Sequence, residues 1–482
     1  MILRNLRRIG ALVLYGLFAT TASASDPPTR LLDELFQDHA VLQRDRPIEI
    51  WGVGAPDDEI RVSFNGAEVS ARADANGAWR TQLPAMPAGG PYALTASAAS
   101  GVTHTISNVL VGDVWLCSGQ SNMEMQTRAS LNFWGESMRA ANESIRLLTV
   151  ARDTSATPRR TFSKPVRWQP TTAESFAEFS AVCFYFAREL QKHVDVPMGL
   201  IHASWGGSRI EPWMSAEALR ATGGYDDMLE ILELRGTQPE AAIQRWGALW
   251  ESWWNERVGG AQPWTGAKRG EWRSAPTKLS HWEGWGDPEL ETFNGMVWLR
   301  ASVELNAKQA KQAATLSLAK IDDVDITWVN GRAVGSTAGP DTDRVYALPK
   351  GVLKAGANTI VVNALDLWAA GGPWGDAPRE LKLADGTSIP LDGKWEYQIV
   401  PTSVGEPPRA PWDVTAGLTV IGNAMIAPLE HYQMRGVLWY QGESNTGQPE
   451  TYEALLRHWM ADWRGRFGSD ASFLIVQLAN FG

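Results

Sequence analysis

The chain has 482 residues, a length that exceeds one ordinary hydrophobic core and predicts two to four domains. Its formal net charge is −10 and it has no long cluster of basic residues, which argues against nucleic acid as a partner. The apolar fraction of 44% is ordinary for a globular protein, and most of the 24 tryptophans are expected to be core.

The first 24 residues have the pattern of a secretory signal peptide. Three arginines give a positive start, an apolar run follows at residues 9–18, and Ala-Ser-Ala at residues 22–24 fits a cleavage site. The apolar run is too short to span a bilayer, and no later stretch is long enough. We therefore expect an exported protein, periplasmic or secreted, with no membrane anchor after cleavage.

Residues 28–108 predict an all-β domain. Strand-like runs occur at residues 48–51, 60–64, 79–83 and 92–96. Asn65-Gly66 and Asn76-Gly77 are turn dipeptides at hairpin spacing. We expect a small β-sandwich of immunoglobulin-like type, whose residues show no pattern that carries chemistry.

The pattern changes near residue 109, where an α/β domain is expected to begin. Residues 114–117 form a continuous apolar run, typical of a strand buried on both faces in a parallel sheet. The small residues of Ser118-Gly119-Gln120-Ser121-Asn122 allow a tight turn at its carboxyl end, where open α/β sheets bind ligands. If a helical turn follows, Ser121 is either a nucleophile beside unpaired backbone N–H groups or, with Asn122, a simple helix cap.

A second strand and turn of the same kind follow. Apolar spacing predicts a helix over 181–192, and the apolar run at residues 198–203 predicts a strand. In the turn at residues 204–209, Gly206 and Gly207 would let backbone N–H groups approach a ligand closely. His202 lies inside the apolar run, so we interpret it as a core or supporting residue and not as a base.

The two cysteines are Cys117 on the first of these strands and Cys183 on the predicted helix. An exported protein could pair them, and two buried free thiols are the alternative. Neither cysteine has the spacing of a metal site, and we expect no metal and no other cofactor.

Residues 216–262 are expected to be helical, and residues 263–400 predict a second β region. Its strand-like runs are residues 296–300, 314–318, 325–329, 359–363 and 394–400. Loop tryptophans are the better candidates for substrate contact, because loops carry binding residues more often than regular elements do. These are Trp264, Trp272, Trp282 and Trp285. The aspartates at 322, 323 and 325 lack the remaining features of an EF-hand, so solvated turn carboxylates are favoured over a calcium site.

The α/β pattern resumes near residue 420. Residues 437–440 predict a strand that leads into Gln441-Gly442-Glu443-Ser444-Asn445. An amphipathic helix ending near Gly468 and a strand at residues 473–478 follow. One α/β domain is therefore predicted over residues 109–262 and 401–482, with residues 263–400 inserted into it.

Several of these stretches resemble the motif blocks of the sialate O-acetylesterase family, a branch of the SGNH-type hydrolases. Residues 119–123, GQSNM, resemble the nucleophile block, and residues 436–445, GVLWYQGESN, resemble the third block. Two long motifs in the order that the family has them make this resemblance specific. The turn at residues 204–209 resembles the second block, and residues 423–429 resemble a further family stretch. The resemblance implies an SGNH-like parallel-sheet hydrolase domain, and the inserted region resembles a galactose-binding-like jelly roll.

The resemblance implies a serine carboxylic-ester hydrolase that uses no metal. Ser121 would attack the ester carbonyl, and the oxyanion would be held by backbone N–H groups of Ser121 and of Gly206 or Gly207, with the Asn445 side chain. Supporting residues would orient these groups; they are Gln120, Asn122, Arg209, Gln441 and Glu443. Ser444 is a rival nucleophile, but its neighbours have the appearance of supporting groups.

The family supplies its general base from an Asp-x-x-His block near its carboxyl end, and this sequence has no such block. His431 and His458 do not fit that position, so neither a base histidine nor its aspartate is assigned. We therefore expect the last part of the hydrolase domain to be absent from this chain.

Two functions remain open on this evidence. The first is an exported carbohydrate O-acetylesterase, sialate-type by resemblance, with acetylxylan esterase-type activity as a variant. The second is a non-catalytic carbohydrate-binding protein or an inactive truncated esterase.

Overall fold

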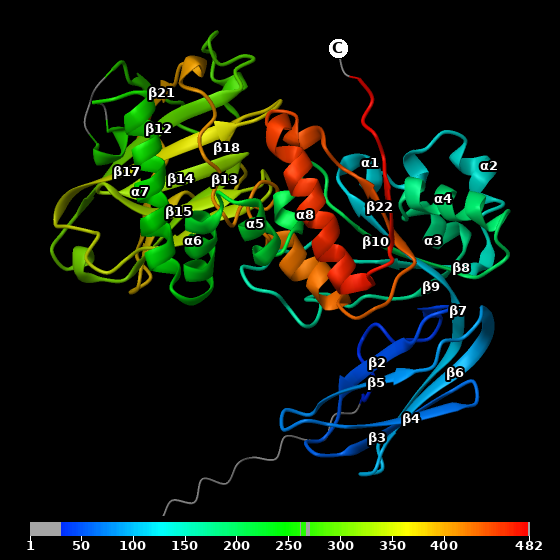
Figure 1. Ribbon diagram of the computed structural model, residues 1–482. Helices are drawn as coiled ribbons and strands as arrows, with labels where there is room; N and C mark the ends of the chain where they lie inside the picture. The colour runs from blue at the N-terminus through cyan, green and yellow to red at the C-terminus, as the bar shows by residue number, and fades with distance from the viewer. Residues whose placement is uncertain (1–29, 261, 267–269, 481–482) are drawn as a thin grey trace, which may run out of the picture.

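The computed structural model describes residues 30–260, 262–266 and 270–480. The predicted signal peptide lies outside these described residues. Figure 1 shows a β part at the amino end (blue to cyan), a sheet flanked by helices, and a second β region (green to yellow). Within the described ranges, no helix is long and apolar enough to cross a membrane.

The amino-terminal part is built almost entirely of antiparallel pairs. It contains β1 (Val41–Gln43), β2 (Ile48–Val53), β3 (Glu59–Phe64), β4 (Ala67–Arg72), β5 (Ala78–Leu83), β6 (Gly89–Ala98) and the first half of β7 (Thr103–Gly119). Strands β4, β3, β6 and β7 form one sheet, and β2 pairs with β5. The strand-like runs predicted at residues 48–51, 60–64, 79–83 and 92–96 are confirmed, because alternating apolar residues find a core on one face.

Strand β7 continues out of this part into a parallel sheet. Its carboxyl half lies between β10 (Met198–Ser204) and β22 (Gly436–Tyr440), and both neighbours run parallel to it. Beyond them lie β8 (Asn142–Thr149) and β23 (Ser472–Ile475), also parallel, and β9 (Gln169–Thr171) closes one edge in the antiparallel sense. The continuous apolar run in β7 is thereby explained, since both faces of this sheet are covered.

Helices cover the two faces with alternate residues of the same strands. Helix α4 (Ala181–Gln191) packs over the face that carries Trp115 and Cys117, and a disulfide joins Cys117 to Cys183 of this helix. Helix α8 (Pro449–Phe467) packs over the opposite face, against Trp439 of β22. The structure thus has the paired form of the two cysteines. Helix α3 (Ala173–Ala177) packs on β9.

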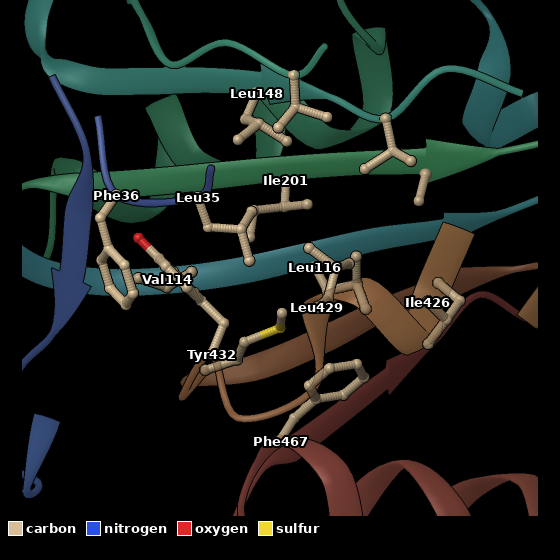
Figure 2. Close-up of a cluster of buried hydrophobic side chains, with 14 of the residues drawn as sticks. Leu35, Phe36, Val114, Leu116, Leu148, Ile201, Ile426, Leu429, Tyr432 and Phe467 are labelled. Atoms are coloured by element: carbon tan, nitrogen blue, oxygen red, sulfur yellow. The ribbon is translucent and has the colours of Figure 1, made fainter. Parts of the chain in front are cut away.

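One core joins the amino-terminal part to the parallel sheet. Figure 2 shows Leu35 and Phe36 beside side chains of β7, β8 and β10 and of the segment before β22. The labelled side chains are Leu35, Phe36, Val114, Leu116, Leu148, Ile201, Ile426, Leu429, Tyr432 and Phe467. Because the two parts share this core, it supports the carboxyl ends of β7, β8 and β10.

Three helices connect the sheet to the second β region. They are α5 (Ala216–Thr222), α6 (Asp226–Thr237) and α7 (Pro239–Arg257), in the segment predicted to be helical. Helix α7 packs Trp246, Trp250 and Trp254 against β strands of the second β region.

The second β region contains two packed sheets. The first has the order β11-β21-β12-β17-β14-β15, and the second has β16-β13-β19-β20 with β18 beside β13. Their bounds are β11 (Arg273–Ser274), β12 (Gly295–Leu305), β13 (Ala314–Asp322), β14 (Val324–Val329), β15 (Arg332–Ala338), β16 (Asp343–Ala347), β17 (Gly356–Asp366), β18 (Gly372–Trp374), β19 (Glu380–Leu383), β20 (Ser388–Pro390) and β21 (Trp395–Ile399). The first sheet is buried on both faces, by the second sheet on one side and by α7 on the other.

The prediction that loop tryptophans contact a substrate is wrong for Trp264 and Trp282, which are 4% and 0% exposed. Trp264 joins the aromatic cluster under α7, and Trp282 packs under the glycines at 371 and 372. Trp272 lies under the Arg300 guanidinium, 4.0 Å from the ring centroid. Their loops fold back onto the sheets, which hides the rings that a loop position was expected to expose.

Candidate active site

The three turns singled out in the sequence follow three adjacent parallel strands. Residues Ser204, Gly119 and Tyr440 lie at the same level of β10, β7 and β22. Since the strands are parallel and in register, the turns that follow them meet at one edge of the sheet. Figure 1 shows α1 (Ser121–Glu124) above the ends of these strands.

Ser121 is the first residue of α1 and is exposed. The N-cap position belongs to Gln120, and no side chain caps the helix, so the alternative that Ser121 serves as a cap is not what the structure shows. Among the described residues, no partner hydrogen-bonds to its hydroxyl. An exposed hydroxyl at the start of a helical turn is available to a ligand.

The Ser121 turn is fixed to the turn after β22. Gln120 is buried and its Oε1 accepts hydrogen bonds from the backbone N–H groups of Gly442 and Ser444, both at 3.3 Å. Asn122 Nδ2 donates to Glu443 Oε1 at 2.8 Å. At Gly119 a side chain is excluded, because its φ is +141° and a Cβ would lie 2.1 Å from the carbonyl oxygen of Tyr440. Gln120, Asn122 and Glu443, of which supporting roles were expected, thus hold the two turns together.

Gly206 is the glycine that lies against Ser121. A Cβ built on Gly206 would be 3.6 Å from the Ser121 Cβ, whereas Gly207 faces open space with φ +73°. The Gly206 N–H donates to Glu124 Oε2 at 2.5 Å. The other oxygen of Glu124 forms an ion pair with Arg152. The Gly206 N–H, which the resemblance assigns to the oxyanion hole, is thus hydrogen-bonded to the Glu124 carboxylate.

Asn445 is 4% exposed and lies in a hydrogen-bonded network. Its Oδ1 accepts from Ile210 N–H at 3.0 Å and from Gln441 Nε2 at 2.8 Å, and its Nδ2 donates to Glu211 Oε2 at 3.0 Å. The network ties the turn after β22 to the turn after β10. Asn445 is therefore held firmly, with one of its two Nδ2 hydrogens engaged by Glu211.

Arg209 is not brought to Ser121. Its guanidinium lies 3.4 Å from Glu406 Oε1, and it is absent from the lining of the cavity at Ser121. The chain turns away at Ile210, which carries Arg209 toward the segment before β22.

A cavity of about 690 Å³ opens beside Ser121. Its lining comes from the ends of the strands and from the segment after α1. The lining residues include Ser121, Glu124, Met125, Gln126, Ala129, Arg152, Glu178, His202, Ser204 and Gly206. Arg152 also lies over the ring of Trp205, 5.7 Å from its centroid. The cavity is thus mixed in character, with one cation, two carboxylates and several small or apolar side chains.

His202 lies at the base of this cavity and is paired with Ser204. Its Nε2 is 2.5 Å from Ser204 Oγ, and its ring packs against Phe179. Burial, followed by the positive charge of Arg152, lowers the pKa of His202 to about 4. The imidazole is therefore neutral at pH 7. The supporting role expected of His202 agrees with this contact.

The remaining candidate histidines lie elsewhere. His431 contacts Arg80 and Glu49 of the amino-terminal part, and His458 contacts Thr222 of α5. Within the described ranges, no histidine hydrogen-bonds to Ser121. The same ranges contain no group of three or more potential ligands arranged to hold a metal ion.

Two segments of the chain, residues 111–250 and 399–482, match the family model described as carbohydrate esterase, sialic acid-specific acetylesterase. The predicted family resemblance is confirmed. These segments contain the carboxyl half of β7, β10, β22 and all three turns. The sialate O-acetylesterase family is thus matched on both sides of the second β region.

Curated sialate O-acetylesterases are also similar to part of the chain. The enzyme of Pongo abelii is 36% identical over 193 residues, which cover 36% of this chain and 36% of the relative. The human enzyme is 35% identical over the same length and shares. The chain thus spans about a third of the length of the curated relatives it matches.

A solved carbohydrate acetylesterase from Xanthomonas citri is also similar. It is 24% identical, with 94% of this chain and 61% of that chain covered and a TM-score of 0.49.

Glu124 and Arg152 were not predicted from the sequence. Glu124 stands three residues after Ser121, so a single turn of α1 returns its side chain to the site. Arg152 follows β8 at the same edge of the sheet, a position that could have been weighed once four parallel strand ends were expected. Glu211, the partner of Asn445, gave no signal beyond its place after the second turn.

Proposed function

We propose that this chain is a carbohydrate O-acetylesterase, sialate O-acetylesterase-like, that removes acetyl esters from sugars through an acyl-enzyme on Ser121. The observation that carries the proposal is the exposed Ser121 hydroxyl, at the meeting point of three turns that follow adjacent parallel strands. The match of these segments to the acetylesterase family supports it. We also propose that the chain has an SGNH-type hydrolase domain, with an immunoglobulin-like sandwich before it and an inserted galactose-binding-like jelly roll; the parallel sheet and the antiparallel sheets on either side support this.

In this mechanism the Ser121 Oγ attacks the acetyl carbonyl carbon and loses its proton to a base. The sugar oxygen leaves with a proton, and water then releases acetate from the serine. The carbonyl oxygen becomes an oxyanion, for which the backbone N–H groups of Ser121 and Gly206 and the second Nδ2 hydrogen of Asn445 are the donors at hand.

Glu124 has to release the Gly206 N–H before that donor can serve. Its ion pair with Arg152 gives the carboxylate a second partner on the side away from Gly206. Substrate entry would then exchange the Glu124 carboxylate for the acetyl oxygen at this N–H group.

Acetate release from 4-nitrophenyl acetate tests the nucleophile. Ser121→Ala should lower the rate at least about a thousandfold, because the covalent step is lost. Ser444→Ala is the matched control, since this serine lies in the facing turn and should leave the rate within about threefold. Retained activity in Ser121→Ala, or no activity in the unaltered chain, would overturn the proposal.

We further propose export to the periplasm or the cell exterior. The signal-peptide pattern at residues 1–24 supports it, and so does the disulfide between Cys117 and Cys183, because such bonds persist in oxidising compartments. Periplasmic fractionation with an alkaline phosphatase fusion to residues 1–30 tests this. A fusion that stays inactive in the cytoplasm would contradict it.

A further inference from the structure

Four exposed apolar side chains lie in the segment that follows α1. Met125, Leu131, Trp134 and Met138 are 41%, 95%, 80% and 83% exposed, and all lie within residues 125–138. Met125 itself lines the cavity. Exposed clusters of this kind mark interaction sites more often than isolated exposed residues do.

Next to the cavity lies a second hollow of about 660 Å³, which we call the Trp134 surface. Its lining residues are Arg128, Ser130, Leu131, Asn132, Phe133, Trp134 and Ala177. The lining combines apolar rings with an amide, a hydroxyl and a guanidinium. That combination suits a ligand with one apolar face and many hydroxyls.

Trp134 stands on a rigid support. It lies on α2 (Phe133–Ser137), where its ring packs 5.2 Å from that of Phe133. Phe133 in turn stacks on the buried Phe176, with centroids 6.0 Å apart and planes inclined by 3°. An ion pair between Glu136 and Arg188 fixes the same helix to α4. The helix that carries the indole is therefore fixed before any ligand arrives, which reduces the entropy lost on binding.

The Trp134 surface and the Ser121 cavity are lined by neighbouring residues of the chain. Ala129 lines the cavity, and its neighbours Arg128 and Ser130 line the Trp134 surface. Likewise Glu178 lines the cavity and Ala177 the Trp134 surface. At the boundary, Arg128 forms an ion pair with Glu178 at 2.8 Å. The two hollows therefore lie side by side along residues 128–130.

We propose that the Trp134 surface is a second sugar subsite, which binds a further unit of an oligosaccharide or polysaccharide whose acetylated unit lies at Ser121. This proposal rests on the proposed acetylesterase function and names its substrate class, an acetylated glycan of several units. The apolar C–H face of a pyranose ring stacks on the indole, and Arg128, Ser130 and Asn132 hydrogen-bond to its hydroxyls.

Affinity as a function of glycan length tests the proposal. The probes are fluorescently end-labelled, O-acetylated xylo-oligosaccharides and oligosialic acids, each of one to six units. Fluorescence polarisation is read in a Ser121→Ala background so that no acetyl group is hydrolysed. Trp134→Ala is compared with Trp134→Phe and with Trp368→Ala, a control on the second β region that is 81% exposed. Sedimentation velocity is run on each variant.

We expect one of the two probe series to bind about tenfold more tightly at three or more units than as a single sugar, the gain that one aromatic contact supplies. Trp134→Ala should remove this gain and leave the single-sugar affinity unchanged. Trp134→Phe should keep most of the gain, and Trp368→Ala all of it.

Several results would overturn the proposal. These are a lack of binding by both series, affinity without length dependence, and equal loss of affinity at all lengths in Trp134→Ala. A dimer that dissociates in Trp134→Ala would also overturn it, because the surface would then contact a second copy of the chain. If length-dependent binding is lost in Trp134→Ala while the unaltered chain releases no acetate, the subsite holds and the proposed esterase activity fails.

Discussion

The parallel sheet and the second β region both carry tryptophan and carboxylate side chains, but they place them in opposite environments. In the second β region, Trp250, Trp298 and Trp328 pack ring against ring, and Asp325 is fully buried with Arg344. At the edge of the parallel sheet, Trp134 is 80% exposed and Glu124 lines an open cavity. The residue types alone therefore do not distinguish a core from a binding surface; the covering elements do.

The largest loss of stability is expected on substitution of Trp250, which packs against the second β region. This ring is 2% exposed and contacts Trp254, Trp298 and Trp328 at centroid distances of 5.7, 5.6 and 5.3 Å. Trp250→Ala should lower the free energy of unfolding by about 3–5 kcal/mol, because it leaves a large cavity between α7 and the sheet. Urea denaturation measures this. A loss under about 1 kcal/mol would show that α7 is not needed to cover the sheet.

A somewhat smaller loss is expected at Asn445, where the site region has its own buried polar network. Asn445→Ala should lower the free energy of unfolding by about 3 kcal/mol, because Glu211 and the Ile210 N–H lose a buried partner. Ser121→Ala is the control, since its hydroxyl is exposed and its loss should change stability little. Equal unfolding midpoints for the two variants would contradict the network.

The next smaller effect is a dependence of stability on pH, which is expected from carboxyl groups of the second β region. Burial, followed by the charges of Asp323 and Glu283, raises the pKa of Asp366 to about 6, and burial beside Asp323 raises the pKa of Asp322 to about 7. The folded state therefore holds protons that the unfolded state releases, so this stabilisation is fully present below about pH 4 and is lost as the pH rises through 6 to 7.

Asp366→Asn removes one of these groups. Relative to the unaltered chain, the variant should gain on the order of 2 kcal/mol between pH 4 and pH 8, because it has no charge to bury at the higher pH. Urea denaturation at pH 4.5, 6 and 8 measures the difference. A difference that stays constant with pH would contradict a raised pKa of Asp366.

The smallest effect is expected at Trp134. Because its ring is mostly exposed, Trp134→Ala should change the free energy of unfolding by less than about 0.5 kcal/mol. Thermal unfolding beside Trp250→Ala measures the contrast directly. A loss of more than about 2 kcal/mol would mean that Trp134 belongs to the core of its region, like Trp250.

Much of the site could be predicted from local sequence. The apolar runs before Ser121, Gly206 and Gln441 predicted buried strands, and the glycines predicted tight turns; both are confirmed by β7, β10 and β22. Such patterns are reliable because a buried strand needs apolar residues on both faces, whatever its neighbours are.

Other parts could not be predicted, since they depend on contacts between distant segments. Arg152 reaches Glu124 only because β8 lies two strands from β7, and Trp282 is buried only because the loop at residues 366–372 folds over it. The disulfide was left open because neither cysteine's spacing shows that α4 packs on β7.

Residues close together in the chain were enough to predict the strands, the turns after them and the family that they resemble. Long-range packing sets which tryptophans are exposed, which oxygen accepts the hydrogen bond of the Gly206 N–H group, and which surface lies beside the Ser121 cavity. Burial and hydrogen bonding at these positions are set by contacts between elements that are distant in the chain, such as Glu124 and Gly206, which are 82 residues apart, and no local pattern encodes this packing.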